Sequence, residues 1–208
     1  GLVRCGLSVD SHGAFPGRAP FARRNREWHQ AAAGWLSAPR EDQGSIMACL
    51  LVDARPIHGD PGLPEVTKVF GNFRRHPAIV ELVLHESLAH RAKYRSLRRT
   101  LTRRDQRYDI KTRGLLPIVN IARWAALGVG STELQTTRRL RASAGSEILP
   151  DRHADRLIEA FDVLQRLRLR YQLSQVRQCE APRDSLDRRT PPPTSRTVVA
   201  QAVREIAV

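Results

Sequence analysis

The chain contains few cysteines and few aromatic residues, and no long hydrophobic run. Its 208 residues include three cysteines, Cys5, Cys49 and Cys179, which lie far apart and in no metal-ligand spacing. This usage is typical of a reduced cytoplasmic protein rather than of a secreted protein stabilised by disulfides. The sequence shows neither a hydrophobic run long enough to span a membrane nor a signal peptide. We therefore expect a cytoplasmic protein without a membrane partner.

Lysine is also scarce, although the chain is strongly basic. The formal net charge is +14, but only three of the 35 basic residues are lysines. A charge of this size usually suggests a nucleic-acid partner. The excess of arginine over lysine instead resembles the bias of a GC-rich genome. No helix-turn-helix and no aromatic platform for stacking bases is evident, so we expect no specific binding to nucleic acid.

The spacing of apolar residues predicts an all-α fold, a bundle of about six to eight helices. Residues 1–20 have no sustained period and are interpreted as a linker from an upstream domain, whereas residues 21–208 form the helical domain. The segment 45–54 is short and apolar and could equally be a buried strand. The helices are expected at residues 21–39, 45–54, 65–75, 77–99, 115–127, 132–144, 151–178 and 197–208.

The clearest of these helices covers residues 151–178, with Asp151 as its expected N-cap. One side of this helix carries an apolar seam centred on Leu164, and a second side is apolar as well. Because a helix with two apolar sides can be covered on both, we expect it in the middle of the bundle. The second side consists of Ile158, Leu169, Leu173 and Val176.

Motifs for catalysis and for metal binding are not found. The sequence has no glycine-rich phosphate loop, no nucleophile elbow and no pair of histidines at helical metal spacing with a glutamate base. His85 and His90 would point about 140° apart on a helix, which argues against a shared metal ion. We assign no catalytic residue and no metal ligand to this chain.

One polar cluster follows the apolar segment that ends near residue 54. Asp53, Arg55 and Asp60 lie where the chain turns at a proline and a glycine. Burying a charge is costly unless it is paired, so Asp53 is expected to meet an arginine.

The expected partner is Arg168, which falls inside the apolar seam of helix 151–178, with Gln172 beside it. Arg170 points outward on the same helical wheel. Because guanidinium groups bind carboxylates and phosphates through two parallel hydrogen bonds, two interpretations stay open. Asp53, Arg55 and Arg168 form a network that fixes helix packing, or some of them face an anionic ligand; the two are not exclusive.

Several segments in the same order resemble a known family. The elements are Asp-x-Arg-Pro at residues 53–56, Lys-x-x-Gly-x-x-Pro at 111–117 and Leu-Arg-Leu-Arg-x-Gln at 167–172, within a match from about residue 20 to 180. They resemble the C-terminal substrate-binding domain of bacterial nucleotidyltransferases similar to protein-PII uridylyltransferase. In that family the domain follows a nucleotidyltransferase domain, often behind cyclic-nucleotide-binding and CBS domains.

The resemblance implies a helical bundle like the C-terminal domain of kanamycin nucleotidyltransferase. It also implies an upstream nucleotidyltransferase domain and a protein acceptor as partners, in a signal-transduction role. Mg²⁺ and a nucleoside triphosphate would bind with that catalytic domain, because its pair of metal-holding carboxylates beside a Gly-Ser element does not occur here. The chain alone is therefore expected to be inactive. The substrate-binding residues carried over are Asp53, Arg55, Asp60, Lys111, Arg168, Arg170 and Gln172.

An alternative function of another class is a regulatory module whose helices dock on a sensor domain or a partner protein. The coding sequence upstream of this chain would distinguish the two functions. A nucleotidyltransferase domain there supports the first, and an unrelated sensor domain supports the second.

Overall fold

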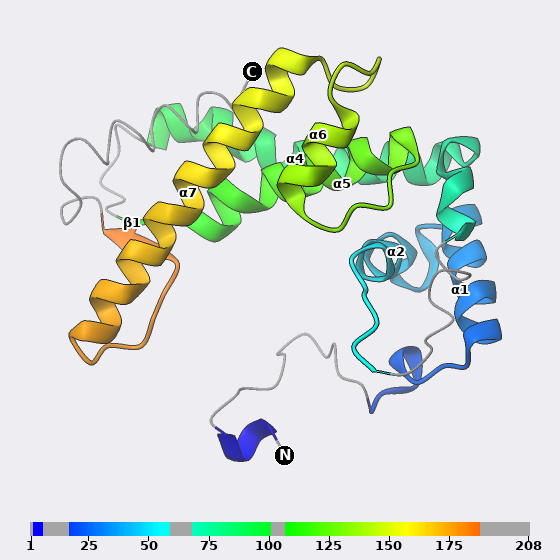
Figure 1. Cartoon of the computed structure of the whole chain (residues 1–208), viewed down its shortest axis with the longest axis horizontal. Helices are drawn as coiled ribbons and strands as arrows, with labels where there is room; N and C mark the ends of the chain where they lie inside the picture. Colours follow the sequence, from blue (N-terminus) through cyan, green and yellow to red (C-terminus); the bar gives the residue numbers. More distant parts are fainter. Residues whose placement is uncertain (1, 6–16, 59–67, 101–106, 188–208) are drawn as a thin grey trace. The chain divides into compact units, whose positions relative to one another are not determined.

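The computed structural model describes residues 2–5, 17–58, 68–100 and 107–187 (Figure 1). The chain divides into two compact units, Gly1–Phe70 and Gly71–Val208. The described residues include six α-helices and one short antiparallel pair of strands. The predicted all-α helical bundle is confirmed. The boundary between a linker and a helical domain at residues 20 and 21 stays a prediction.

The first unit contains two α-helices that pack on each other. α1 (Asn25–Ser37) and α2 (Gly44–Val52) follow the short 3-10 helices η1 (Leu2–Cys5) and η2 (Ala19–Phe21), and η3 (Glu41–Gln43) precedes α2. The segment that could have been a buried strand is thus a helix. The contact between the two helices buries Ala32, Trp35 and Leu36 of α1 and Met47, Ala48 and Leu51 of α2.

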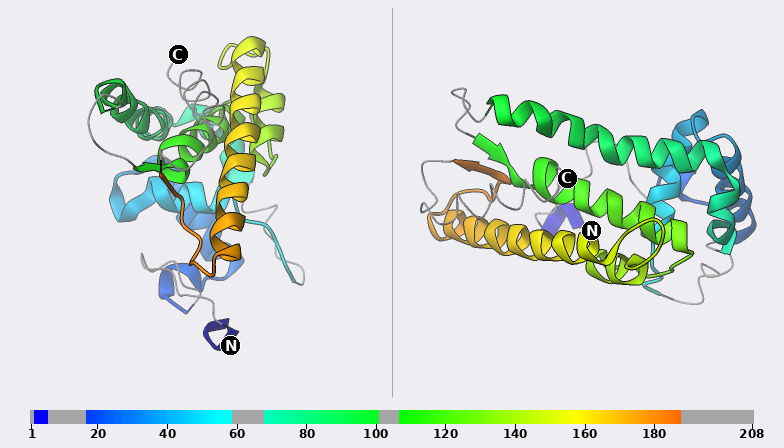
Figure 2. Two further views of the ribbon diagram at one scale, coloured as in Figure 1. Left: turned by 90° about the vertical axis from the view of Figure 1, so that its left-hand side faces the viewer. Right: turned by 90° about the horizontal axis from the view of Figure 1, so that it is seen from above.

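The second unit is built around α5 (Leu116–Val129). This helix packs on α4 (Pro77–Thr100), on α6 (Thr136–Ser143) and on the π-helix η5 (Lys111–Leu115), and α6 packs on α7 (Asp151–Arg177). Both views in Figure 2 place α5 between α4 and α7. The hydrophobic core of this unit consists of Ile110, Leu115, Ile118, Ala122, Ala125, Leu140, Leu149, Ala154, Leu157, Ala160 and Leu164.

A Schellman motif ends α5. Gly130 has φ +72°, and its backbone N–H donates to the carbonyl of Leu127 at 3.2 Å. The N–H of Ser131 donates to the carbonyl of Ala126 at 2.8 Å. These two bonds satisfy carbonyls that the helix leaves open, and the left-handed conformation is one that glycine adopts without steric cost.

The predicted start of α6 and the predicted N-cap of α7 are wrong. α6 begins at Thr136 rather than at residue 132, and residues 132–135 are not helical. Here the carbonyl of Glu133 accepts a hydrogen bond of 2.6 Å from Nε of Arg139, a side chain that is only 3% exposed. We attribute the late start to this bond, because it uses a backbone carbonyl to satisfy a buried guanidinium. α7 begins at Asp151, but its N-cap is Pro150, without a side-chain cap.

On the second apolar side of α7, Ile158 packs against the core, but the other three residues are not covered by the described residues. Leu169, Leu173 and Val176 are 58%, 47% and 54% exposed. The prediction that α7 lies in the middle of the bundle is therefore wrong, and α5 occupies that position instead. Periodicity finds an apolar face, but it does not tell whether another element packs on it.

The segment after α7, where the sequence predicts no helix before residue 197, contains a short strand. Ser185–Asp187 forms the strand β2, which pairs antiparallel with β1 (Arg107–Asp109). Residues 188–196 and the predicted helix 197–208 lie outside the described residues. In the described part of the chain, no helix combines the length and the apolar character that crossing a membrane requires.

Candidate functional site

The last three turns of α7 hold the segment that leads into β2. Nε of Arg168 donates to Oδ1 of Asp184 at 2.6 Å, and Nη2 of Arg168 lies 3.3 Å from Oδ2. Nε2 of Gln172 donates to Oδ1 of the same carboxylate at 2.9 Å. The two charged side chains are 29% and 23% exposed. Asp184 is thus bound bidentately by a guanidinium and a third time by an amide.

A third residue of α7, Gln175, completes this arrangement, which we call the α7 clasp: Arg168, Gln172, Gln175 and Asp184. Gln175 is 6% exposed, and its Oε1 accepts a hydrogen bond of 2.7 Å from the backbone N–H of Arg183. The clasp residues on α7 are spaced by four and three, so one helix face presents all of them. They fix the backbone at residues 183 and 184.

The clasp positions the start of η5. The carbonyl of Asp184 accepts a hydrogen bond of 2.9 Å from the N–H of Ile110, which directly precedes Lys111. Asp109 accepts two bonds from Thr112, 2.8 Å from its backbone N–H and 2.9 Å from its hydroxyl. Lys111 itself is exposed at the first residue of η5. The polar residues at the end of α7 therefore determine where this exposed cation lies.

The structure confirms that Arg168 meets a carboxylate, but the expected partner was wrong. The partner is Asp184, sixteen residues further along the chain, and not Asp53. Asp184 was missed because periodicity assigns no partner to an acidic residue in an irregular segment. The available signal was a short acidic segment, with Glu180, Asp184 and Asp187, directly after a helix that has an arginine in its seam. Arg170 is exposed, as predicted.

The other predicted site residues do not join the clasp. Asp53 follows the last residue of α2 and Arg55 lies two residues further; both belong to the first unit and are exposed. Asp60 lies outside the described residues. The structure therefore brings together Arg168 and Gln172, and places Lys111 next to a residue that the clasp holds.

No group of three or more metal-binding side chains occurs among the residues that the structure describes. The clasp has one carboxylate, which is already bound to an arginine. The chemistry available in this region is therefore binding and positioning by cations and amides.

A family model described as "Putative nucleotidyltransferase substrate binding domain" matches residues 78–207. The chain belongs to this family. No curated protein and no solved structure gives a significant match. The expected likeness to the C-terminal domain of kanamycin nucleotidyltransferase accordingly stays a prediction.

The substrate-binding domain defined by this match contains the clasp, β1, η5 and Lys111. It excludes residues 20–77, which also lay in the range of the resemblance and include the Asp-x-Arg-Pro element at 53–56. Asp53 and Arg55 therefore lie outside the matched range, whereas Lys111, Arg168, Arg170 and Gln172 lie inside it.

Proposed function

We propose that this chain binds the substrate in a nucleotidyltransferase of the protein-PII uridylyltransferase kind. The transfer chemistry is carried by a nucleotidyltransferase domain upstream, which supplies the carboxylates for Mg²⁺ and the nucleoside triphosphate. The observation that carries this proposal is the family match over residues 78–207. A bacterial cytoplasmic signalling protein with a protein acceptor is the matching biological setting.

Within the domain, the residues divide into two roles. Lys111 and Arg170 are exposed cations that can contact an anionic substrate directly. Arg168 already forms two hydrogen bonds with Asp184, so a ligand would have to displace that carboxylate to bind it. We therefore assign Arg168 and Gln172 a positioning role, acting through Asp184 on the backbone next to Lys111.

The test compares the 208-residue chain with the product of its complete coding sequence. With Mg²⁺, each nucleoside triphosphate and a PII-type acceptor protein, we expect transfer by a product that contains the upstream domain and none by the 208-residue chain alone. Lys111→Ala in the longer product should raise KM by about tenfold, the cost of one charge-assisted contact. Arg152→Ala, an exposed arginine in the first turn of α7, is the control and should leave KM unchanged.

Two outcomes would contradict the proposal. The first is turnover by the 208-residue chain that survives repurification and is lost in a point variant of that chain. The second is an upstream coding sequence for an unrelated sensor domain.

The second outcome would favour a regulatory module that docks on another protein. The exposed apolar residues of α7, Leu169, Leu173 and Val176, are the observation that supports this second candidate. Leu173→Asp should then abolish binding to the sensor domain, whereas Lys111→Ala should not.

A further inference from the structure

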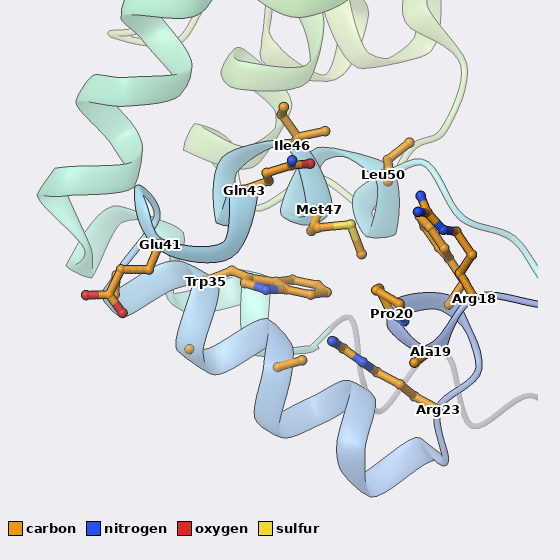
Figure 3. Close-up of a pocket in the computed structure, with 14 residues that line it drawn as sticks. Arg18, Ala19, Pro20, Arg23, Trp35, Glu41, Gln43, Ile46, Met47 and Leu50 are labelled. Atoms are coloured by element: carbon orange, nitrogen blue, oxygen red, sulfur yellow. The ribbon is translucent and has the colours of Figure 1, made fainter. Parts of the chain in front are cut away.

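A pocket in the first unit is the most distinctive feature outside the family domain. It lies between η2, α1 and α2, and has a volume of about 1480 Å³ (Figure 3). All its lining residues fall between Arg18 and Leu50, outside the matched range 78–207. The pocket and the substrate-binding domain are therefore separate features of the chain.

The wall of the pocket contains an arginine that packs against two tryptophan rings. Cζ of Arg23 lies 5.4 Å from the ring centroid of Trp28 and 5.4 Å from that of Trp35. The two rings are 6.2 Å apart and meet edge to face at 73°. Both distances are within the range of a cation–π interaction, and two rings restrict the orientation of the guanidinium.

The guanidinium of Arg23 lacks an acidic partner among the described residues. Its Nη1 atom is buried and forms no hydrogen bond with any of them. A buried donor without a partner costs free energy, and most such groups in folded proteins are satisfied. The aromatic rings offset part of this cost, but they do not supply the acceptor that the charged group favours.

The charged and the apolar side chains lie in different parts of the pocket wall. Arg18 and Arg23 supply two positive charges, and Figure 3 shows Glu41 at the opposite end of the pocket from Arg18. Between them lie Trp35 and the side chains of α2. Ile46 is 53% exposed and Leu50 is 45% exposed, so part of the apolar lining of the pocket is open to a ligand.

We propose that this pocket binds a small organic anion, a phosphate or carboxylate carried on a flat apolar body. The anionic group contacts Arg23 and Arg18, and the apolar body lies against Trp35, Ile46 and Leu50. An inorganic anion would use the cations and leave the apolar surface in water. A neutral aromatic molecule would leave Arg23 without its acceptor. The combination selects ligands that carry both parts.

Nuclear magnetic resonance of the full 208-residue chain tests this binding through the indole N–H signals. The chain has three tryptophans, two beside Arg23 and one, Trp124, in the second unit, which serves as an internal control. We expect phenyl phosphate or benzoate to shift the signals of Trp28 and Trp35 saturably and to leave Trp124 unchanged. The tighter of the two ligands identifies the anionic group.

Two simpler ligands test the anionic contact and the apolar contact separately. Inorganic phosphate and phenol should each bind at least about tenfold more weakly than phenyl phosphate, because each lacks one of the two contacts. If inorganic phosphate binds as tightly as phenyl phosphate, the apolar body makes no contribution to binding. If phenol binds as tightly as phenyl phosphate, the anionic group makes none. Either result overturns the proposal.

Variants locate the binding on Arg23. Arg23→Lys keeps the charge but loses the planar group, and should weaken phenyl phosphate by about 10- to 100-fold. Arg18→Ala, an exposed position, should weaken it less. Arg26→Ala is the control, because Arg26 is an exposed arginine of α1 that does not line the pocket. Unchanged affinity in both Arg23→Lys and Arg18→Ala would overturn the assignment, as would the absence of saturable shifts at Trp28 and Trp35.

The proposal does not rest on nucleotidyl transfer. Loss of binding in the Arg23 variant with intact substrate binding by the family domain, or the reverse, would separate the two functions.

Discussion

The first half of α7, residues 151–164, is held by apolar burial, whereas the second half, residues 165–177, combines two partly buried apolar side chains, Leu167 and Tyr171, with hydrogen bonds to the segment after the helix. Ala154, Leu157, Ala160 and Leu164 are buried in the core of the second unit. In the second half, Leu169 and Leu173 are exposed, and the contacts to the rest of the fold include those of the clasp. One continuous helix thus combines a half that is buried in the core with a half that also makes directional hydrogen bonds. The second half is the one that positions residues near Lys111.

The largest expected effect is on the buried half. Leu164 is 0% exposed, and Leu164→Ala should lower the free energy of unfolding by about 2–5 kcal/mol, because it removes apolar contacts and leaves a cavity. Leu173→Ala, at 47% exposure, is the matched control and should cost less than about 1 kcal/mol. Urea denaturation of both variants measures the difference. Equal losses would mean that the exposed side of α7 is covered in solution.

A smaller loss is expected in the clasp. Arg168→Ala should cost about 1–2 kcal/mol, since its carboxylate partner is 23% exposed and regains some solvation. Arg170→Ala, exposed on the same helix, should cost less than about 0.5 kcal/mol. In a double-mutant cycle, the combined variant Arg168→Ala with Asp184→Ala should lose less stability than the sum of the two single losses. Zero coupling would contradict the ion pair, and a larger loss for Arg170→Ala would contradict the helical phase.

The smallest effect concerns the end of the polar half. Cys179 has φ +58° and closes α7 as Gly130 closes α5: its N–H donates to Val176, and that of Glu180 donates to Gln175. Because a side chain is disfavoured in this conformation, Cys179→Gly should raise stability by about 0.5–1 kcal/mol. Gly130→Ala, the converse change, should lower it by about 1 kcal/mol. Thermal denaturation should show a stability gain for Cys179→Gly and a loss for Gly130→Ala. A stability loss for Cys179→Gly would mean that the sulfur makes a favourable contact.

Much of the helical architecture followed from the sequence, because apolar residues at spacings of three and four reveal which residues share a helix face. The bounds of α4, α5 and α7 were predicted within two residues. The same pattern could not show that Leu169 and Leu173 stay exposed, since exposure depends on which elements pack there. Nor could it place β2, because three residues are too few for an alternating pattern.

At the candidate site, the sequence predicted the kind of interaction that Arg168 makes but not the residue with which it makes it. Arg168 was expected to need a carboxylate, because a charge in an apolar seam is costly without one. Which carboxylate it meets depends on how the chain returns after α7, and no local pattern encodes that return. The role of Lys111 as a substrate-binding residue rests on the family and stays a prediction.

The bond between the N–H of Ile110 and the carbonyl of Asp184 joins two segments with the whole of α5, α6 and α7 between them. Closing so long a loop costs chain entropy before any contact at its ends compensates for it. The helices in between can form from local contacts much earlier. During synthesis, moreover, Asp184 leaves the ribosome long after Ile110. We therefore expect the start of η5 to be among the last parts of this domain to become ordered, later than the core on which it rests.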